Sequence, residues 1–522
     1  MDTRMPVVET SFWMAFERRA VAAGAAPLVV DGLSGVALSW AQVHAQAEGL
    51  AAWLSAQGVT PGAVVSWQLP TGLPSFVLQL ALARIGAVQS PLISVYGAAE
   101  TLAVLRRNQP AFHVVLDGDL AGLDQQAPAL LAQMQQPAKL LCLGGPLPQA
   151  DPADLPPPPA DHHTVRWLYA TSGTTSEPKG VRHTDESVLR AGRNLALAMA
   201  AQPEDVGTIA YPIAHIGGAM YTAMLAASGA SVVLLPRFQI AEAVQVFARH
   251  GVSLSGGSTA HYQAFLGEQG RSPGPLLMPR LRLLAGGGAP KPPDLVARVQ
   301  AELGCVLAHA YGMTEAPLVS AGRVDDTPEQ LAWSDGAVCD TFEVRLTDAE
   351  GRTVATGTEG EIRLRGPGLF KGYTDPALNA QAFDEDGWFR TGDLGRLRPD
   401  GHLAVTGRLK DIIIRKGENI SAREVEDVLS RHPKVGAVAV IGLPDAERGE
   451  RVCAVVELRQ AGDRLSFAEM VAWFISAQVM RQKIPEQLEV VDTLPRLASL
   501  NKVSKAALRE RFAHPPRPLP FN

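Results

Sequence analysis

Amphipathic helical stretches alternate along the chain with short runs of valine, leucine and isoleucine. This alternation predicts βαβ units, and therefore a mostly parallel sheet that is buried on both faces. Residues 39–57 are one such helix, because Ser39 is a suitable N-cap, apolar residues recur at helical spacing and Gly58 ends the pattern. Residues 64–69 follow as a predicted strand. The predicted fold class is α/β.

The pattern also predicts a domain boundary near residues 407–411. A strand-like segment, residues 402–406, precedes this point. A short apolar run at 412–414, a Lys-Gly turn and a helix at 422–431 follow it. The three predicted parts of the chain are a large N-terminal domain of residues 1–407, a connecting segment 408–411 and a small C-terminal domain of residues 412–522.

Composition indicates a large globular protein and excludes several classes. The 522 residues are 46% hydrophobic and 19% charged, which argues against disorder. With 47 basic and 53 acidic residues and no block of like charges, nothing favours nucleic-acid binding. Four scattered cysteines without CxxC spacing indicate neither a zinc site nor a disulfide framework, and a reducing cytoplasm fits best. Residues 1–20 do not resemble a signal peptide, and no segment predicts a transmembrane helix.

A hydroxyl-rich loop at residues 169–181 carries the first chemical signal. It reads Tyr-Ala-Thr-Ser-Gly-Thr-Thr-Ser-Glu-Pro-Lys-Gly-Val and follows a short apolar run. Hydroxyl donors, glycines that let backbone N–H groups approach closely, and the charge of Lys179 together predict a triphosphate cradle. It is not a Walker A loop, because Lys179 follows Pro178 and precedes Gly180. An ordinary surface loop is the alternative. The candidate nucleotide contacts are Thr171, Ser172, Gly173, Thr174, Thr175 and Lys179.

At this loop the chain resembles the adenylate-forming superfamily of acyl-CoA synthetases, luciferases and peptide-synthetase adenylation domains, whose loop runs Ser-Gly-Thr-Thr-Gly-x-Pro-Lys-Gly. Ser176 stands where that family usually has glycine. The resemblance implies a large multi-sheet N-terminal domain that holds ATP and the acyl group, and a small mobile α+β C-terminal domain that turns about Lys410. The other segments that resemble family motifs, in the family's order, are 286–290, 311–315, 360–373, 388–393, 407–411, 415–421 and 501–503.

The resemblance implies adenylation, in which a carboxylate attacks the α-phosphorus of ATP and pyrophosphate leaves, so that catalysis is mainly positioning and charge stabilisation. Glu315 is the expected Mg²⁺ ligand, and Thr314 the expected donor to the α-phosphate. Lys502 is expected to carry the adenylation step as a point charge. The local match is imperfect, because Asn501 replaces the usual glycine and one residue is added. Lys505 is therefore a rival.

The same motifs imply the remaining nucleotide contacts. Tyr311 offers an aromatic face to adenine, with core packing as the alternative. Asp393 is expected to accept the ribose hydroxyls, with a turn-forming role as the alternative, and Arg408 can reach the sugar or the phosphates. The backbone of residues 287–290 is expected to close around the base. The remaining expected contacts are Gly288, Ala289, Pro290 and Gly312.

Thioester formation is the implied second half-reaction, with free coenzyme A as the expected acceptor. Lys416 and Gly417 resemble the turn that lines the pantetheine channel, where a glycine lets a thin carrier pass beside the backbone. The walls of the expected acyl pocket are small and apolar and lack Arg and Lys, which favours a neutral hydrophobic monoacid of medium-chain or alicyclic type, such as cyclohexanecarboxylate. His215 is either a gate beside the carboxylate or a core histidine. The expected acyl-pocket residues are His215, Gly217, Gly218 and Gly287.

These interpretations predict an AMP-forming acid–CoA ligase that uses ATP, Mg²⁺ and coenzyme A on a small-molecule carboxylic acid. No nucleic-acid or membrane partner is expected, and a homodimer stays open. Two alternatives also stay open. One is an adenylating enzyme that loads a separate acyl carrier protein, and the other is a catalytically silent nucleotide-binding homologue, suggested by Ser176 and Asn501. Luciferase-type oxidation has no specific support.

Overall fold

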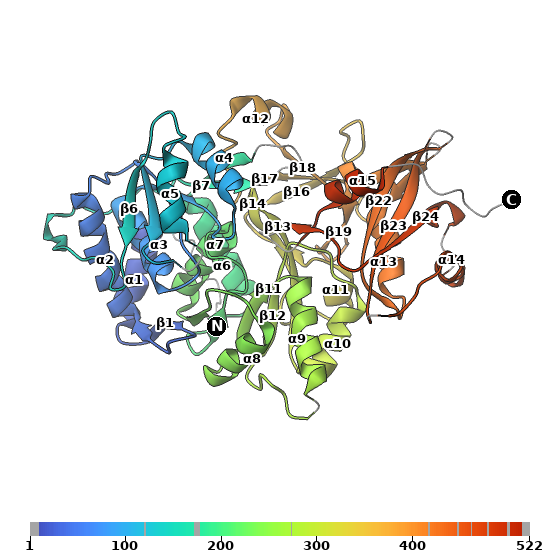
Figure 1. The fold of residues 1–522 in the computed structure, drawn as a ribbon, viewed down its shortest axis with the longest axis horizontal. Coiled ribbons are helices and arrows are strands. Elements are labelled where there is room, and N and C mark those ends of the chain that lie inside the picture. Colours follow the sequence, from blue (N-terminus) through green and yellow to red (C-terminus); the bar gives the residue numbers. More distant parts are fainter. Residues whose placement is uncertain are drawn as a thin grey trace. The chain divides into compact units, whose positions relative to one another are not determined.

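The computed structural model describes residues 10–119, 122–171, 178–272, 274–415, 418–445, 448–460, 462–477, 480–497 and 502–513, with only the backbone described at 418, 419, 482, 497 and 502. The chain forms two compact units, which are considered separately (Figure 1). The first unit is Met1–Glu343 with Leu364–Phe389, and the second is Val344–Arg363 with Arg390–Asn522.

One mostly parallel sheet of the first unit has six strands among the described residues, in the order β6-β5-β3-β4-β7-β8. All neighbours in this sheet are parallel except β7 and β8, which form an antiparallel hairpin. Its central strands are buried, as the apolar runs predicted, and β3 confirms the strand expected at 64–69. The strands are β3 (Val64–Gln68), β4 (Val88–Pro91), β5 (Phe112–Leu116), β6 (Lys139–Leu143), β7 (Val165–Thr171) and β8 (Lys179–Thr184).

A second sheet of the first unit has nine strands in the described part of the chain, in the order β15-β14-β13-β12-β11-β9-β10-β1-β2. Six neighbouring strands of this sheet are parallel, namely β13, β12, β11, β9, β10 and β1. Their carboxyl ends therefore lie along one edge, which is where ligands bind in open α/β sheets. The strands are β1 (Pro27–Asp31), β2 (Ala37–Ser39), β9 (Val206–Thr208), β10 (Ser231–Leu234), β11 (Leu254–Gly257), β12 (Leu283–Gly287), β13 (Val306–Met313), β14 (Ala316–Ala321) and β15 (Ala337–Val338).

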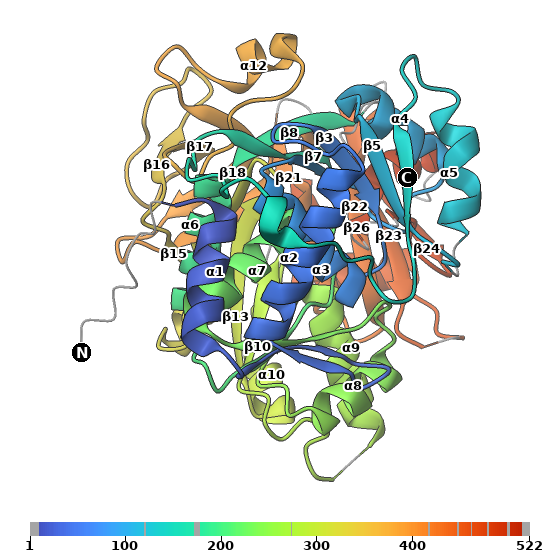
Figure 2. The same ribbon diagram turned by 90° about the vertical axis from the view of Figure 1, so that its left-hand side faces the viewer.

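Helices connect and cover these strands. The predicted helix at 39–57 is confirmed as α2, whose Ser39 forms a capping box with Gln42 and whose Trp40 is buried. Helices α1, α2 and α3 pack against one another (Figure 2). The helices of this unit are α1 (Phe12–Ala23), α2 (Trp40–Ala56), α3 (Leu73–Ile85), α4 (Ala98–Asn108), α5 (Leu123–Leu131), α6 (Asp185–Ala198), α7 (Ile216–Ser228), α8 (Ile240–Arg249), α9 (Thr259–Arg271), α10 (Asp294–Leu303), α11 (Pro328–Trp333) and α12 (Pro376–Ala382), with a 3₁₀ turn η1 (Pro152–Asp154).

Helices α6 and α7 approach each other closely at Gly192. A Cβ atom at this position would lie 2.7 Å from the backbone carbon of Ala223 and 2.7 Å from the backbone nitrogen of Met224, well inside van der Waals contact. Only glycine therefore allows this helix spacing. The contact matters for the site, because α6 follows β8 directly and α7 begins immediately after His215.

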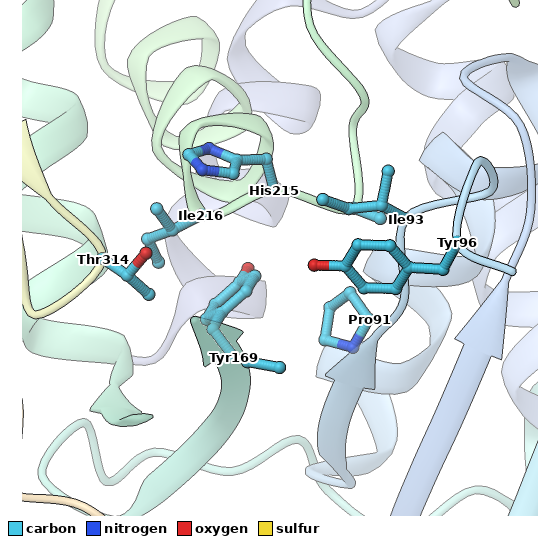
Figure 3. A pocket seen from close by; sticks show the side chains of 9 residues that line it. Pro91, Ile93, Tyr96, Tyr169, His215, Ile216 and Thr314 are labelled. Carbon is cyan, nitrogen blue, oxygen red and sulfur yellow. The ribbon is translucent and has the colours of Figure 1, made fainter. Parts of the chain in front are cut away.

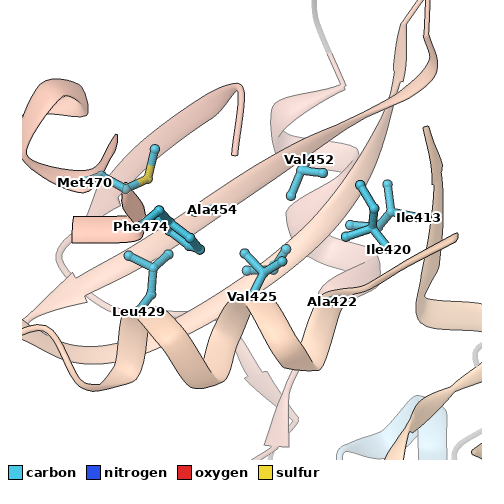
Figure 4. Packing of buried hydrophobic residues seen from close by; sticks show 10 residues of the cluster. Ile413, Ile420, Ala422, Val425, Leu429, Val452, Ala454, Met470 and Phe474 are labelled. Atoms are coloured by element: carbon cyan, nitrogen blue, oxygen red, sulfur yellow. The ribbon is translucent and has the colours of Figure 1, made fainter. Parts of the chain in front are cut away.

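The second unit contains most of a four-stranded sheet, β16-β17-β18-β19, and a sheet of β21-β20-β23-β22 with β24 added beside β23. Helices α13 and α14 bury Val425, Leu429 and Phe474 against the second of these sheets (Figure 4). The elements are β16 (Glu343–Thr347), β17 (Glu359–Arg365), β18 (Phe389–Leu397), β19 (Leu403–Arg408), η2 (Leu409–Asp411), β20 (Ile412–Arg415), β21 (Glu418–Ser421), α13 (Ala422–Ser430), β22 (Val435–Asp445), β23 (Gly449–Leu458), α14 (Phe467–Ser476), η3 (Arg481–Lys483), β24 (Gln487–Val491), β25 (Arg496–Leu497), β26 (Lys502–Val503) and α15 (Lys505–Phe512).

The elements expected around residue 410 are confirmed as β19, β20 and α13. By contacts, however, the second unit also includes residues 344–363 and 390–407, which the sequence assigned to the large domain. Compact units are defined by their internal contacts, whereas a hinge is defined by the motion of one domain relative to another. The predicted boundary at 408–411 therefore stays a prediction. Among the described helices, none combines the length and the apolar character that a membrane crossing requires.

Candidate functional site

The Tyr-Gly-Met-Thr-Glu motif lies where β13 turns into β14. The two strands pair antiparallel, so Thr314 and Glu315 form the short connection between them. A Cβ atom at Gly312 would overlap the backbone carbonyl of Pro317, so this tight hairpin requires glycine there. Both side chains are half-buried. The motif thereby places a hydroxyl and a carboxylate side by side at the end of a buried strand.

Glu315 is held by Tyr373, which the sequence analysis quoted within a motif but did not single out. The Tyr373 hydroxyl donates a 2.8 Å hydrogen bond to Oε1 of Glu315. The Lys179 ammonium lies 5.0 Å from the centroid of the Tyr373 ring, within cation–π range. Burial, and then the Glu315 carboxylate, raises the pKa of Tyr373, so its hydroxyl remains a donor. One tyrosine therefore contacts both the candidate metal ligand and the candidate phosphate lysine.

His183 on β8 supports Thr314, and sequence reasoning gave it no role. Its Nε2 lies 2.6 Å from the backbone oxygen of Thr314. Burial lowers the pKa of His183 to about 4, so the ring is neutral at ordinary pH. A carbonyl can only accept, so Nε2 carries the proton and Nδ1, 2.8 Å from Oγ of Ser187, is the unprotonated nitrogen. This hydrogen bond ties the Thr314 backbone to the strand that leaves the phosphate loop.

The described ends of the phosphate loop lie opposite each other. Thr171 ends β7 and pairs in register with Lys179, the first residue of β8. Gly180 accepts a 2.8 Å backbone hydrogen bond from Thr374, which fixes the segment that carries Tyr373 against β8. The predicted contacts Ser172, Gly173, Thr174 and Thr175 lie outside the described residues.

A pocket opens beside Thr314, and His215 forms part of its wall (Figure 3). The space between the lining residues, open solvent included, is about 260 Å³. The lining contains no charged side chain among the described residues, and its polar groups are the His215 imidazole and the hydroxyls of Thr314, Tyr96 and Tyr169. The lining residues are Pro91, Ile93, Tyr96, Tyr169, Ala170, Ala214, His215, Ile216 and Thr314.

His215 is the N-cap of α7 as well as a pocket residue. Its Nδ1 accepts a 3.3 Å hydrogen bond from the backbone N–H of Gly217, which satisfies a free donor at the helix start. Since Nδ1 accepts, the neutral ring carries its proton on Nε2. The side chain is half-buried. The imidazole is therefore oriented by the helix that it caps.

The predicted acyl-wall glycines lie at close backbone approaches. A Cβ atom at Gly217 would lie 2.7 Å from the Tyr211 ring, and one at Gly218 would overlap the carbonyl of Ile213. A Cβ atom at Gly287 would overlap the carbonyl of Ala310 on the neighbouring strand β13. The Tyr211 hydroxyl donates to the backbone oxygen of Gly217 at 3.3 Å. Close packing alone thus explains why these positions are glycine.

The predicted adenine side of the site follows β12. Gly288 has a φ of 85°, a conformation that favours glycine, and turns the chain out of the strand. The Thr259 hydroxyl donates to the backbone oxygen of Pro290 at 2.8 Å and fixes the loop on α9. Ala289 lies between Gly288 and Pro290 in this loop. Tyr311 on β13 is only 9% exposed, so little of its ring is accessible in this structure.

In the second unit, Asp393 and Arg408 form an ion pair across β18 and β19. They are cross-strand partners, and Nε of Arg408 lies 2.7 Å from Oδ1 of Asp393. The carboxylate is almost buried, whereas the guanidinium is half-exposed. The backbone N–H of Asp393 donates to the Thr391 hydroxyl at 3.0 Å. The structure thus brings together two of the predicted ribose and phosphate contacts.

At the predicted pivot residue, Lys410 on η2, burial and then the Arg408 cation lower the pKa of the side chain.

Lys505, the alternative candidate for the adenylation lysine, is engaged in ion pairs, with its Nζ 2.7 Å from Glu426 and 3.9 Å from Asp411. The Lys502 backbone begins β26, whereas its side chain lies outside the description. Lys416 and Gly417 also lie outside the described residues. The ion pairs of Lys505 indicate a structural role for that side chain.

Comparison with known proteins supports this reading of the motifs. Residues 16–374 match the family model described as AMP-binding enzyme, and residues 424–500 match the AMP-binding enzyme C-terminal domain. The medium-chain fatty-acid–CoA ligase of Escherichia coli (strain K12) is 32% identical over 509 residues, covering 92% of this chain and 87% of that protein. The salicyl-AMP ligase / salicyl-S-ArCP synthetase of Mycobacterium tuberculosis is 33% identical over 486 residues, with 90% and 85% covered.

Among solved structures, ATP-bound MatB from Rhodopseudomonas palustris superposes with a TM-score of 0.86 at 27% identity. The match covers 96% of this chain and 99% of that one. Because it spans nearly the whole of both chains, it confirms the α/β class, with a large multi-sheet region followed by a smaller C-terminal domain.

Proposed function

The chain belongs to the family of AMP-binding, adenylate-forming enzymes, and from that premise we propose that it is an AMP-forming acid–CoA ligase for a hydrophobic monocarboxylic acid. The position of the pocket carries the proposal. Thr314, the proposed donor to the α-phosphate, and His215, the proposed neighbour of the acid, line the same space. A carboxylate that attacks the α-phosphorus must lie between these two groups.

The residues around Glu315 fit a magnesium ion. Mg²⁺ prefers carboxylate oxygens and water, and Glu315 offers Oε2 because Oε1 already accepts the Tyr373 hydroxyl. When bound, the ion would neutralise negative charge on the phosphates. Lys179, held beside the Tyr373 ring, would add a second positive charge. Glu315 and Lys179 thereby form the charged end of the proposed site.

In the proposed adenylation step the protein positions groups and stabilises charge. The Thr314 hydroxyl donates to an α-phosphate oxygen, and the hydrogen bond from His183 to the Thr314 backbone keeps this residue in place. His215 lines the same space as Thr314 and is the proposed neighbour of the carboxylate. Asp393 would accept the ribose hydroxyls, and Lys502 would supply the charge that adenylation needs. In the second half-reaction a thiol attacks the acyl carbon and AMP leaves.

The acid and the acceptor follow from the chemistry of the pocket and from the relatives. An apolar lining without a charged side chain favours a neutral medium-chain or alicyclic acid over a dicarboxylate. The named activity of the Escherichia coli relative supports coenzyme A as the acceptor. The Mycobacterium tuberculosis relative is also named a salicyl-S-ArCP synthetase, which supports acyl transfer to a carrier protein as the second candidate. The four free thiols fit a reducing compartment, so we place the enzyme in the cytoplasm.

The experiment measures pyrophosphate and AMP release from Mg²⁺-ATP with a panel of aliphatic, alicyclic and aromatic acids, with and without coenzyme A. We expect acyl-CoA and AMP with one group of hydrophobic acids, and none of either with dicarboxylates. Pyrophosphate release without CoA-dependent turnover would instead favour the carrier-protein alternative. Glu315→Gln serves as the matched background control. No pyrophosphate release with any acid would contradict the proposal.

A further inference from the structure

Tyr169 lines the pocket, and its buried hydroxyl has no hydrogen-bond partner among the described residues. The residue lies on β7, its side chain is 3% exposed, and Figure 3 shows its hydroxyl directed into the space between Thr314, His215 and Tyr96. Within the part of the chain that the structure describes, this oxygen has no hydrogen-bond partner. An unpaired buried hydroxyl destabilises a protein by about 1–3 kcal/mol. A ligand that forms a hydrogen bond with this hydroxyl therefore removes that destabilisation.

Tyr221 also has a buried hydroxyl without a hydrogen-bond partner among the described residues, but this residue does not line the pocket. Three further tyrosines of the first unit are paired. The hydroxyl of Tyr262 donates to the Gly257 oxygen at 3.3 Å, and that of Tyr211 donates to the Gly217 oxygen at the same distance. Tyr373 donates to Glu315. The Tyr169 ring is itself well fixed, since it stacks on Trp167 with 6.3 Å between centroids and an interplanar angle of 7°. Figure 3 shows that the hydroxyl at the end of this ring points into the pocket.

The neighbours of Tyr169 indicate which ligand atom it meets. Thr314 is the proposed α-phosphate donor, and the Tyr169 hydroxyl faces the same space. Burial raises the pKa of Tyr169, so this group is a protonated donor. The described lining contains no cation, so a hydrogen-bond donor is what the pocket offers to an anionic oxygen. In the proposed reaction the anionic group that must enter beside the α-phosphate is the carboxylate of the acid.

We propose that the Tyr169 hydroxyl donates a hydrogen bond to the substrate carboxylate oxygen that does not attack phosphorus. This inference rests on the proposed function. The other carboxylate oxygen forms the new O–P bond, the bond between the α-phosphorus and the bridging oxygen breaks, and pyrophosphate leaves with that electron pair. Tyr169 transfers no proton. The oxygen that it holds becomes the carbonyl oxygen of the acyl-adenylate, so the same hydrogen bond serves substrate and intermediate.

The test compares Tyr169→Phe with Tyr221→Phe. Tyr221 is a matched control, because it is equally buried but packs against Gly207 and does not line the pocket. Two kinetic constants are measured, KM for the acid and KM for ATP. Two dissociation constants are also measured, for AMP and for an acyl-sulfamoyl adenosine, a stable analogue that carries the acyl carbonyl. These binding measurements do not require turnover.

In Tyr169→Phe we expect KM for the acid to rise, and the affinity for the analogue to fall, by about tenfold or more, the size expected for a lost hydrogen bond to a charged or polarised oxygen. KM for ATP and the affinity for AMP should stay unchanged, and Tyr221→Phe should change none of the four constants.

Tyr169→Leu provides a second variant without the hydroxyl if the phenylalanine variant does not fold. Unchanged acid KM and analogue affinity, or equal losses for the analogue and AMP, would overturn the inference. A wild-type protein that neither turns over any acid nor binds the analogue would instead refute the proposed function, and this inference with it.

Discussion

At the scale of single residues, Tyr373 links the candidate metal ligand to the candidate phosphate lysine. Its hydroxyl holds Oε1 of Glu315, and its ring lies beside Lys179. The phenylalanine variant at this position removes the first contact and keeps the second. The two contributions of this side chain are therefore separable by a one-atom change.

We expect Tyr373→Phe to raise the Mg²⁺ concentration needed for half-maximal pyrophosphate release by about tenfold, because one hydrogen bond that orients the Glu315 carboxylate is lost. A Mg²⁺ titration at saturating ATP and acid measures this change. Thermal stabilisation by ATP without Mg²⁺ should match that of the wild type, since Lys179 keeps its aromatic neighbour. Tyr221→Phe is the control. An unchanged Mg²⁺ dependence would show that Tyr373 does not position Glu315.

The buried histidines predict how stability depends on pH. Burial lowers the pKa of His113 on β5 from 6.5 to about 4, and its Nδ1 lies 2.8 Å from the Ser66 hydroxyl. Between these pKa values the unfolded chain binds more protons than the folded one, so stability is fully present above pH 6.5 and falls as the pH drops towards 4. His183 acts in the same direction.

We expect the melting temperature of the wild type to fall between pH 7 and pH 5, with each histidine contributing up to about 1.4 kcal/mol per pH unit. His113→Gln should be less stable than the wild type at pH 7 but should lose less stability on acidification, because one of the two groups no longer titrates. Melting curves at several pH values test this. Parallel pH profiles for the two proteins would contradict the assignment.

At the scale of elements, the contact between α6 and α7 sets the position of His215. A Cβ atom at Gly192 would lie 2.7 Å from backbone atoms of α7, the helix that His215 caps. We expect Gly192→Ala to destabilise the protein by about 1–3 kcal/mol through overpacking, and to raise KM for the acid because α7 must move. Thermal unfolding and steady-state kinetics measure both effects.

The control for this change is Gly267→Ala on α9. No atom lies within 4 Å of a Cβ built there, and the position is helical. Alanine should therefore stabilise the helix by roughly 0.5–1 kcal/mol, with unchanged kinetics. Equal melting temperatures for the two alanine variants would show that α6 and α7 are not closely packed at Gly192.

At the scale of the whole molecule, two lysines near the end of the chain are expected to behave differently. Lys505 is ion-paired with Glu426 and lies near Asp411, which Arg509 also contacts at 3.1 Å. Lys502 is proposed to act in adenylation. We expect Lys502→Ala to slow pyrophosphate release by about 100-fold or more, while preformed acyl-adenylate and coenzyme A still give acyl-CoA.

The matched variant, Lys505→Ala, should lower the melting temperature and leave adenylation largely intact, because it breaks the ion pair with Glu426. Measuring the two half-reactions separately distinguishes the lysines. Equal loss of both half-reactions in Lys502→Ala would remove the proposed role, and loss of adenylation in Lys505→Ala alone would transfer that role to the rival.

The sequence by itself determined what depends on near neighbours in the chain. The cap at Ser39, the strand at 64–69 and the helix that begins at Ala422 follow from propensity and periodicity. The ordered motifs identified the adenylate-forming family, which the comparisons confirm.

Only the tertiary structure decided how the site residues are held. Tyr373 meets Glu315 across 58 positions, and His183 meets Thr314 across 131. The pairing of β17 with β18 joined residues 344–363 to the second unit, and the packing of β7 turned the Tyr169 hydroxyl into the pocket. Such contacts form only when distant segments pack together. Hydrophobic periodicity predicts the strand or helix in which a side chain lies, but it does not predict which distant residue that side chain will contact, because the same strand or helix can form with many different partners.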